Sequence, residues 1–177
     1  MKKTLCILFC IVTLLSLTAC QNEIPKNMQA CASENEAFNF YVPKTWALNT
    51  SSGTASALFS ATDRSNVSMT CMIAEPGFET LEDYTKKAFD SYREILPGFD
   101  GIVALPGEDG NNGSALGGEP AAYMTYTATL DGVNYKYMQL VCKHNEMFYV
   151  FTYTSTVEKF DSHAEELDLM LQYISFK

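Results

Sequence analysis

Positive charge is scarce in this sequence of 177 residues. It holds 12 Lys and Arg residues against 21 Asp and Glu residues, so its formal net charge is −9. Proteins that bind nucleic acids need clustered Lys or Arg side chains to neutralise phosphates. The basic residues of this chain are few and spread thinly, so the sequence predicts no nucleic-acid partner.

Histidine and known catalytic motifs are also scarce. The chain has two histidines, and it has no G-x-S-x-G elbow, no P-loop, no G-x-G-x-x-G and no C-x-x-C pair. These patterns are typical of hydrolases, nucleotide-binding proteins and zinc sites. We therefore predict a protein that is not an enzyme and has no catalytic residue, no metal site and no cofactor.

The N-terminal apolar stretch is too short for a permanent membrane anchor. Lys2 and Lys3 precede thirteen apolar or small residues, 5–17, whereas a membrane-spanning helix needs about 20. A short basic region followed by such a stretch is typical of a signal peptide. It ends in Leu17-Thr18-Ala19-Cys20, which resembles the bacterial lipobox, where the Cys thiol receives diacylglycerol and the chain is cut just before it. An ordinary secretory signal with a chance cysteine is the alternative.

The lipobox predicts where the protein is found. Residues 1–19 would be a lipoprotein signal peptide, and Cys20 would carry the lipid. Each buried CH₂ contributes about 0.8 kcal/mol, so two fatty acyl chains such as palmitate anchor a protein stably. We expect a lipoprotein at the extracytoplasmic face of the cell membrane, with the membrane as a partner through the lipid on Cys20.

The segment after the lipobox is polar and has no apolar periodicity. Gln21 to Glu36 contains one proline and few residues that can be buried, so it offers little to offset its ordering entropy. We predict a flexible tether over residues 20–36 and one folded domain over residues 37–177.

Three cysteines remain in the predicted mature chain beyond Cys20. They are Cys31, Cys71 and Cys142, an odd number, so at least one is unpaired within the chain. Cys71 and Cys142 fall in strand-like runs and are interpreted as small buried hydrophobic residues. A Cys71–Cys142 disulfide, or one that contains Cys31, is the alternative.

The domain alternates between strand-like and helix-like patterns. Leu81–Leu96 has apolar residues at helical spacing, with Thr80 and Asp83 placed to cap it. A second helix is predicted over about Asp161–Tyr173, with Ser162 and Glu165 as a capping box. Between the helices, Pro106–Pro120 is rich in glycine and predicts a loop. The remaining predicted strands are Phe38–Val42, Ala57–Ala61, Asn66–Ile73, Phe99–Leu105, Ala121–Leu130, Val133–Lys143 and Met147–Ser155.

The last three strands predict an antiparallel meander. Asp131-Gly132 supplies the positive φ of a tight hairpin turn, and a second turn is expected near His144-Asn145. These strands are apolar or aromatic on both faces, so both faces need a cover. The predicted fold class is α/β (α+β), an α/β/α sandwich whose central, mainly antiparallel sheet is covered by helices on both faces.

Five stretches together resemble the PsbP-like superfamily, named for an extrinsic protein of photosystem II. They span residues 38–177 and comprise Phe38–Trp46, Ser65–Ser68, Glu82–Tyr84, Gly117–Ala121 and Tyr149–Ser155. The resemblance implies an α/β/α sandwich in an extracytoplasmic accessory protein. Photosynthetic members help to hold manganese, calcium and chloride at a neighbouring complex, and a Ran-binding import factor shares the fold. The family has no shared catalytic motif.

Two histidines and one loop are candidate ligand sites. His144 is interpreted as a solvated turn residue, and His163 as part of an acidic helix start beside Asp161, Glu165 and Glu166. A metal ligand is the alternative for each. Asp109–Gly113 is only faintly similar to a calcium loop, and the neighbouring carboxylates Glu108 and Asp109 lie in a flexible loop.

Tyrosine is concentrated in the predicted meander. Packing across neighbouring strands is the leading interpretation, and a binding surface is the alternative, because tyrosine is enriched at protein interfaces. The tyrosines are Tyr123, Tyr126, Tyr135, Tyr137, Tyr149 and Tyr153.

These observations predict a membrane-tethered, non-enzymatic lipoprotein that binds an envelope protein or acts as an envelope accessory protein. The alternative is a small-ligand or metal-ion binding module at the cell surface, which a pocket lined by tyrosines and a few acidic residues would favour.

Overall fold

The computed structural model describes residues 24–33, 36–49, 55–107 and 114–177. The predicted signal peptide, Cys20 and the loop residues 108–113 lie outside the described residues. The weak calcium-loop pattern at Asp109–Gly113 and the Glu108–Asp109 pair therefore cannot be placed in the fold.

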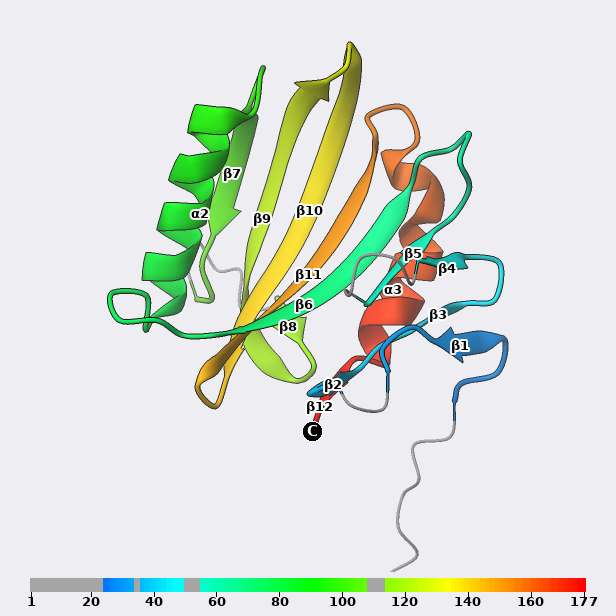
Figure 1. Ribbon diagram of the computed structural model, residues 1–177, viewed down its shortest axis with the longest axis horizontal. Coiled ribbons are helices and arrows are strands. Elements are labelled where there is room, and N and C mark those ends of the chain that lie inside the picture. Colours follow the sequence, from blue (N-terminus) through cyan, green and yellow to red (C-terminus); the bar gives the residue numbers. More distant parts are fainter. Residues whose placement is uncertain (1–23, 34–35, 50–54, 108–113) are drawn as a thin grey trace, which may run out of the picture.

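A curved antiparallel sheet of eight strands forms the centre of the fold (Figure 1). Seven strands follow the order β4-β5-β6-β11-β10-β9-β7, and β8 pairs with β9. Their bounds are β4 Ala47–Asn49, β5 Ala55–Leu58, β6 Asn66–Ile73, β7 Asp100–Ala104, β8 Ala115–Leu116, β9 Glu119–Leu130, β10 Val133–His144 and β11 Met147–Thr156.

The predicted meander is confirmed as β9, β10 and β11. Asp131 and Gly132 have φ values of 50° and 75°, the left-handed geometry that a two-residue hairpin turn requires. This turn pairs Leu130 with Val133 and, counting outward, Tyr126 with Tyr137. The turn chemistry therefore sets which side chains meet across the sheet.

Strand β11 divides the interior into two cores. Phe148 and Val150 pack on one face of the sheet, while Tyr149, Phe151 and Tyr153 pack on the other. Successive side chains of a strand point to opposite faces, so a strand that is apolar at every position needs packing partners on both sides.

Helix α2, Leu81–Ile95, lies on the Phe148 face. Thr80 caps its first turn, because the Asp83 amide donates to Thr80 Oγ1 at 3.1 Å and Thr80 Oγ1 donates to Asp83 at 2.6 Å. This is the predicted cap. Phe89 is buried against the sheet, and Tyr84 stacks on Phe148 with ring centroids 4.8 Å apart.

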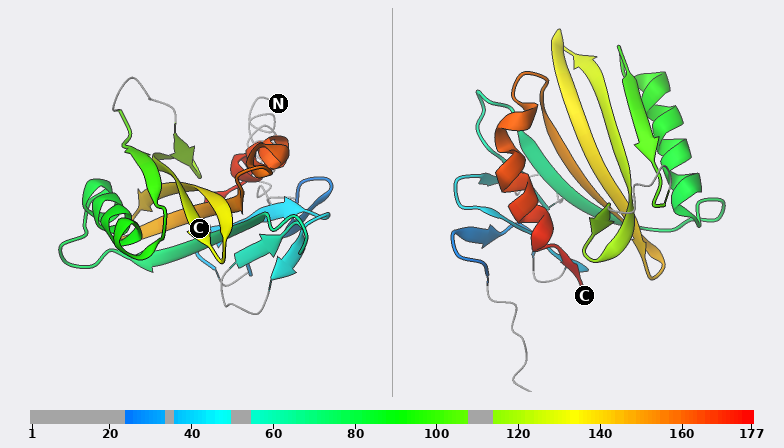
Figure 2. Two further views of the ribbon diagram at one scale, coloured as in Figure 1. Left: turned by 90° about the horizontal axis from the view of Figure 1, so that it is seen from above. Right: turned by 180° about the vertical axis from the view of Figure 1, so that it is seen from behind.

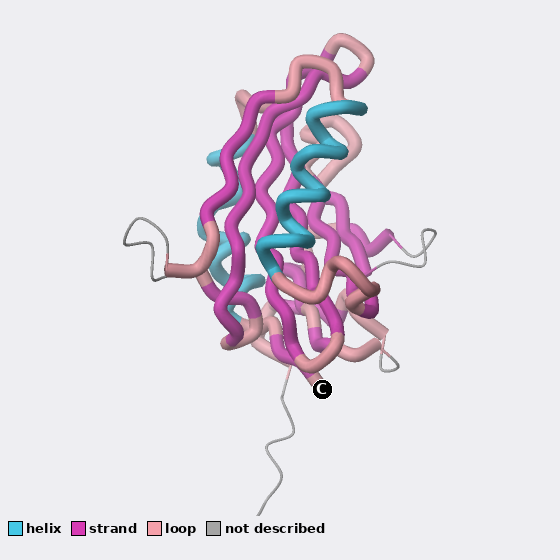
Figure 3. The backbone as a smooth tube through the Cα atoms, turned by 90° about the vertical axis from the view of Figure 1, so that its left-hand side faces the viewer, coloured by secondary structure: helices cyan, strands magenta, loops and turns pink. Residues whose placement is uncertain are grey.

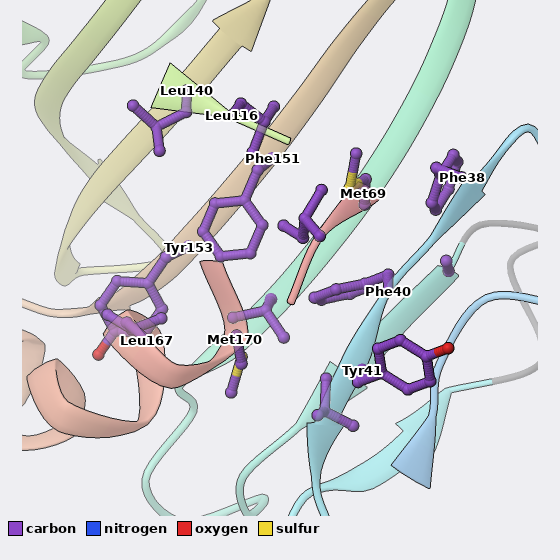
Figure 4. Close-up of a cluster of buried hydrophobic side chains, with 14 of the residues drawn as sticks. Phe38, Phe40, Tyr41, Met69, Leu116, Leu140, Phe151, Tyr153, Leu167 and Met170 are labelled. Atoms are coloured by element: carbon purple, nitrogen blue, oxygen red, sulfur yellow. The ribbon is translucent and has the colours of Figure 1, made fainter. Parts of the chain in front are cut away.

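The opposite face is covered by α3 and by the N-terminal segment. Helix α3, Ala164–Gln172, places Leu167 and Met170 near Phe151 and Tyr153 (Figure 4). The N-terminal segment adds β1 Met28–Ala30, β2 Phe38–Asn39 and β3 Tyr41–Pro43, and β2 pairs with β12, Ser175–Phe176. Phe40 packs edge-on against Phe151.

The expected sandwich covered by helices on both faces needs correction. The chain has the α+β class and the mainly antiparallel sheet, but the two α-helices of the described residues have only 15 and 9 residues. They lie on opposite sides of the sheet near its two ends (Figures 2 and 3). Helix α2 contacts β7 and β10 and leaves part of the sheet face on its side uncovered. Extended N-terminal strands do part of the covering expected of helices. Within the described residues, no helix is long and apolar enough to cross a membrane.

Two local predictions are also wrong. The Ser162–Glu165 capping box does not form, because a 3₁₀ turn, η2 Phe160–His163, precedes α3, and the N-cap residue His163 makes no side-chain capping bond. The predicted loop over Pro106–Pro120 includes β8 and the beginning of β9.

The predicted flexible tether over residues 20–36 contains structure. Met28–Ala30 pairs with β3, and Met28 is only 2% exposed. The Met28 side chain packs in the core that contains Phe151 and Tyr153. Its burial offsets the entropy cost of ordering the short polar segment around it. The folded domain therefore begins before residue 37.

Met28→Ala tests this correction. A buried Met replaced by Ala should lower the free energy of unfolding by about 2–5 kcal/mol, because a cavity is left in the core. Denaturant unfolding of the purified protein measures this change. Ile24→Ala is the control, since Ile24 is exposed and should change stability by less than about 0.5 kcal/mol. Equal stability of Met28→Ala and the unchanged protein would mean that residues 28–30 are only a spacer.

Candidate binding surface

Part of the sheet face beside α2 is polar and open. On this face Ser68 lies opposite Ser56 on one side and Thr152 on the other, and Thr154 lies opposite Asn66. All five side chains are partly exposed, while their neighbours along β6, such as Val67 and Met69, are buried on the other face. We call Ser56, Asn66, Ser68, Thr70, Thr152 and Thr154 the polar face.

A row of tyrosines borders the polar face. Tyr92 of α2 lies 5.0 Å from Tyr126, Tyr126 stacks on Tyr137 at 4.7 Å, and Tyr135 follows at 6.5 Å, all between ring centroids. Gly101 allows β7 to approach this row, since a Cβ there would lie 2.5 Å from the Cβ of Tyr126. We call Tyr92, Tyr126, Tyr137 and Tyr135 the tyrosine row.

Two tyrosines of the row, Tyr126 and Tyr137, are held in their neutral form. Burial raises the pKa of Tyr126, and Tyr92 and Tyr137 raise it further. Burial also raises the pKa of Tyr137, with a smaller contribution from Tyr135. These two side chains are therefore uncharged phenols rather than phenolates.

Gln139 joins the row to the polar face. Its Nε2 donates to Thr152 Oγ1 at 3.1 Å and to the Tyr92 hydroxyl at 3.4 Å. Its side chain is buried, and among the residues that the structure describes its Oε1 has no hydrogen-bond partner. An unpaired buried acceptor costs roughly 1–3 kcal/mol, so an apolar residue would serve better if this position were only structural.

A groove of about 440 Å³ lies at the end of the tyrosine row. It runs between the turn at residues 60–65 and the β9–β10 hairpin. Tyr135, Tyr137 and Thr154 line it together with Arg64 and Asp131. Its volume falls within the roughly 300–1,000 Å³ typical of ligand sites.

Arg64 sits in a rigid turn. Its φ of 65° is left-handed, which costs a residue with a Cβ roughly 1–2 kcal/mol. The turn is closed by the Arg64 amide on Ser60 O at 2.9 Å and by the Asp63 amide on Ser60 Oγ at 3.0 Å. Ser65 Oγ is 2.8 Å from Ser155 Oγ in the interior, which fixes the turn to β11.

His163 contacts the same turn from the interior of the domain. Its Nε2 is 3.3 Å from Asp63 Oδ1, and its Nδ1 is 2.6 Å from Glu166 Oε2. The ring is buried and packs against Phe59 and Trp46 at 4.3 and 5.3 Å between centroids. Both ring nitrogens are engaged by carboxylates, so His163 holds η2 and α3 to the turn.

His144 is not the solvated turn residue that the sequence suggested. It is the last residue of β10, and its Nδ1 is 2.8 Å from Glu119 Oε1. Its ring stacks on Phe176 at 5.0 Å, and Phe176 lies 4.2 Å from Tyr149. His144 therefore packs the C-terminal strand against the sheet.

The structure settles the cysteine alternatives for the described residues. Cys71 and Cys142 both lie opposite Tyr149, on the two strands that flank β11. Two strand spacings separate them by roughly 9–10 Å, which exceeds the Cα separation of a disulfide. Cys31, Cys71 and Cys142 are all free thiols. Burial raises the pKa of Cys31 and of Cys142 to about 12, with Glu119 adding to the rise for Cys142.

The six predicted tyrosines divide between the two faces. Tyr123, Tyr149 and Tyr153 share the face of the main core, and Tyr149 and Tyr153 are fully packed there. Tyr126, Tyr135 and Tyr137 line the other face. Packing across neighbouring strands is therefore confirmed for Tyr149 and Tyr153, and the binding-surface interpretation stays a prediction for the tyrosines of the other face. Among the residues with described positions, no group of three or more His, Cys, Asp or Glu side chains could hold a metal ion.

Comparisons with known proteins define the fold. No known family profile matches the chain, and no curated protein matches it by sequence. Among solved structures, the chain shares its fold with cyanobacterial PsbP, in agreement with the fold that the sequence resemblance implied. It resembles cyanobacterial PsbP (CyanoP) from Synechocystis with a TM-score of 0.57 and 15% identity, over 91% of this chain and 99% of that one.

Two further structures share the fold. LpqN, involved in cell envelope biogenesis of Mycobacterium tuberculosis, gives a TM-score of 0.54 and 13% identity, over 85% of this chain and 90% of LpqN. The Ran-binding protein Mog1p of Saccharomyces cerevisiae gives 0.55 and 7% identity, over 85% of this chain and 95% of Mog1p. At sequence identities this low, the structural likeness shows a shared fold alone.

Part of this surface can be predicted from the sequence, namely the placement of the tyrosines on neighbouring strands. The two-residue turn at Asp131-Gly132 fixes the register that pairs Tyr126 with Tyr137, and strand alternation then places Tyr135 beside them. The approach of Arg64 to Tyr135 and of Asp63 to His163 joins residues 71 and 100 positions apart. No local pattern encodes these contacts.

Asp63→Asn tests the contact between Asp63 and His163 through its pH dependence. Burial raises the pKa of Asp63, but hydrogen bonds from Ser65 and His163 and the attraction of His163 more than offset it, so the pKa lies below its usual value. The carboxylate therefore stabilises the fold above the unfolded pKa of about 3.9, and this contribution is lost as the pH falls through the lower folded pKa.

Denaturant unfolding between pH 7 and pH 3 measures this effect. Asp63→Asn should lower the free energy of unfolding by about 1–3 kcal/mol near neutral pH, and the difference should shrink in acid. Asp161→Asn, at an exposed position of η2, is the matched control and should show little change. A loss for Asp63→Asn that is the same at every pH would contradict a charged contact between Asp63 and His163.

Proposed function

We propose that this protein is an extracytoplasmic accessory protein, tethered to the cell membrane by lipid on Cys20, that binds a partner protein through the polar face and the tyrosine row. The observation that carries the proposal is the open, rigid surface of tyrosine, serine, threonine and asparagine side chains beside α2.

The composition of this surface suits protein recognition. Tyrosine offers a large contact area with few rotatable bonds, and Ser, Thr and Asn offer adaptable hydrogen bonds, as in antibody combining sites. The stacking of Tyr137 on Tyr126 fixes its ring before binding, which lowers the entropy cost of association. The likeness to the Ran-binding protein Mog1p supports a binding role, and the likeness to LpqN supports a role at the cell envelope.

A second candidate is a small-ligand binding module. The groove of about 440 Å³ favours it, because two tyrosines and one acidic residue line a space of suitable size. Such a module would bind its ligand with the groove alone and would not need Ser68 or Thr152 on the polar face.

The lipid anchor is tested by Cys20→Ser. The substitution should move the protein from the membrane to the soluble extracytoplasmic fraction, since hydroxyl oxygen replaces the sulfur that is alkylated. Fractionation with immunoblotting, and mass spectrometry of the N-terminal peptide, measure the change. Cys31→Ser is the matched control and should stay at the membrane. Unchanged membrane association of Cys20→Ser would overturn the anchor.

The docking surface is tested by crosslinking in intact cells. A photoreactive benzoylphenylalanine replaces Thr154 on the polar face, and in a matched strain it replaces Tyr173, which is 39% exposed at the end of α3. Crosslinking at position 154 should give one envelope protein, identified by mass spectrometry, and position 173 should not give it.

Binding of that purified partner then tests the tyrosine row. Tyr137→Ala should weaken the affinity by about 30-fold, because an interface tyrosine in a packed centre contributes 2 kcal/mol or more. Tyr173→Ala should leave the affinity unchanged. The same adduct at both positions, or no adduct at 154, would overturn this surface as the docking site.

A further inference from the structure

Arg64 is an unusual cation in this chain. The sequence has 21 acidic residues and only two arginines, Arg64 and Arg93. Arg93 forms an ion pair with Asp90 at 3.0 Å. Within the described part of the chain, Arg64 has no carboxylate at ion-pair distance, and its guanidinium donates to the Tyr135 hydroxyl at 3.1 Å.

The fold holds Arg64 in place before any ligand arrives. Its left-handed backbone is fixed by the turn at residues 60–65, and that turn is fixed by Ser155 and by His163. Strained backbone that the surroundings enforce is found preferentially at functional sites. The hydrogen bond to Tyr135 sets the guanidinium at the lip of the groove, at the end of the tyrosine row.

The remaining donors of Arg64 suit one kind of ligand. A guanidinium has five N–H donors in a planar fork, and the Tyr135 hydroxyl accepts from one nitrogen. A carboxylate matches the fork with two parallel bonds. The groove walls are otherwise neutral at Asn66, Tyr137 and Thr154, and Asp131 supplies a single negative charge. That charge disfavours a ligand with several negative charges.

We propose that Arg64 binds an aspartate or glutamate side chain of the partner protein, which enters the groove beside Tyr135 and Tyr137. The proposal rests on the docking surface proposed above and adds the chemistry of its anchor point. A protein with a net negative charge would thus select a single acidic side chain through the guanidinium of Arg64, whose turn is held in place by the fold.

The two arginines make a direct test possible. The full chain, purified as the cell makes it and labelled with ¹⁵N-arginine, gives two side-chain Nε–Hε signals. Titration with N-acetyl-glutamate N-methylamide should shift the Arg64 signal along a saturating curve and leave the Arg93 signal in place. N-acetyl-glutamine N-methylamide has the same shape without the charge and should shift neither signal.

Variants separate a carboxylate site from general charge attraction. With tyrosine ring signals of the row as reporters, Arg64→Lys should weaken binding of the glutamate probe about tenfold, because it keeps the charge and loses the fork. Arg64→Gln should abolish binding, and Arg93→Gln should not alter it. Parallel, unsaturated shifts of both arginines, or unchanged binding to Arg64→Gln, would overturn the proposal.

Failure of the anchor and failure of the docking surface give different results. A crosslink at position 154 whose yield is the same in Arg64→Gln would overturn the Arg64 anchor and leave the docking surface standing. Selective glutamate binding without any crosslink would support the Arg64 site and overturn the proposed partner.

Discussion

The alternation of β11 is the constraint on which the rest of the structure depends. From Phe148 to Phe151 each side chain is buried, on one face and then on the other. Two separate covers are therefore needed, and the chain supplies them from distant segments, α2 on one side and α3 with the N-terminal strands on the other. Beyond Phe151 the pattern changes, because Thr152 and Thr154 replace apolar residues on the α2 face while Tyr153 stays buried on the other. At this point α2 no longer covers the sheet, and the polar face begins.

The buried His163 connects the interior to this surface. It lies among aromatic rings, and its two nitrogens face carboxylates from the turn at residues 60–65 and from α3. A buried polar group is tolerated when its hydrogen bonds are complete. Here the same bonds position Asp63, one residue before Arg64. The position of the turn that bears Arg64 is thus determined by the contacts of the buried His163.

The sequence predicted those parts of the fold whose signals are local. Helix α2 follows from apolar spacing and the Thr80–Asp83 cap, and the meander follows from Asp131-Gly132, because both depend on residues close in sequence. The burial of Met28 and the 3₁₀ turn before α3 depend on distant partners. The same holds for the surface: tyrosine enrichment was visible, but its division between two faces and the meeting of Arg64 with Tyr135 required the assembled sheet.

The position of β1, the first strand that the structure describes, has a geometric consequence. Segment Ile24–Ala30 lies at the lower end of the domain, while the turn that bears Arg64 and the tip of the β9–β10 hairpin lie at the upper end (Figure 1). A chain fastened at its leading end would carry the turn that bears Arg64 on the upper side of the domain, away from the point of attachment. The distance of this turn from the membrane would then decide which partner proteins it can contact. Shortening the segment before Ile24 would change that set of partners without altering any contact among the described residues.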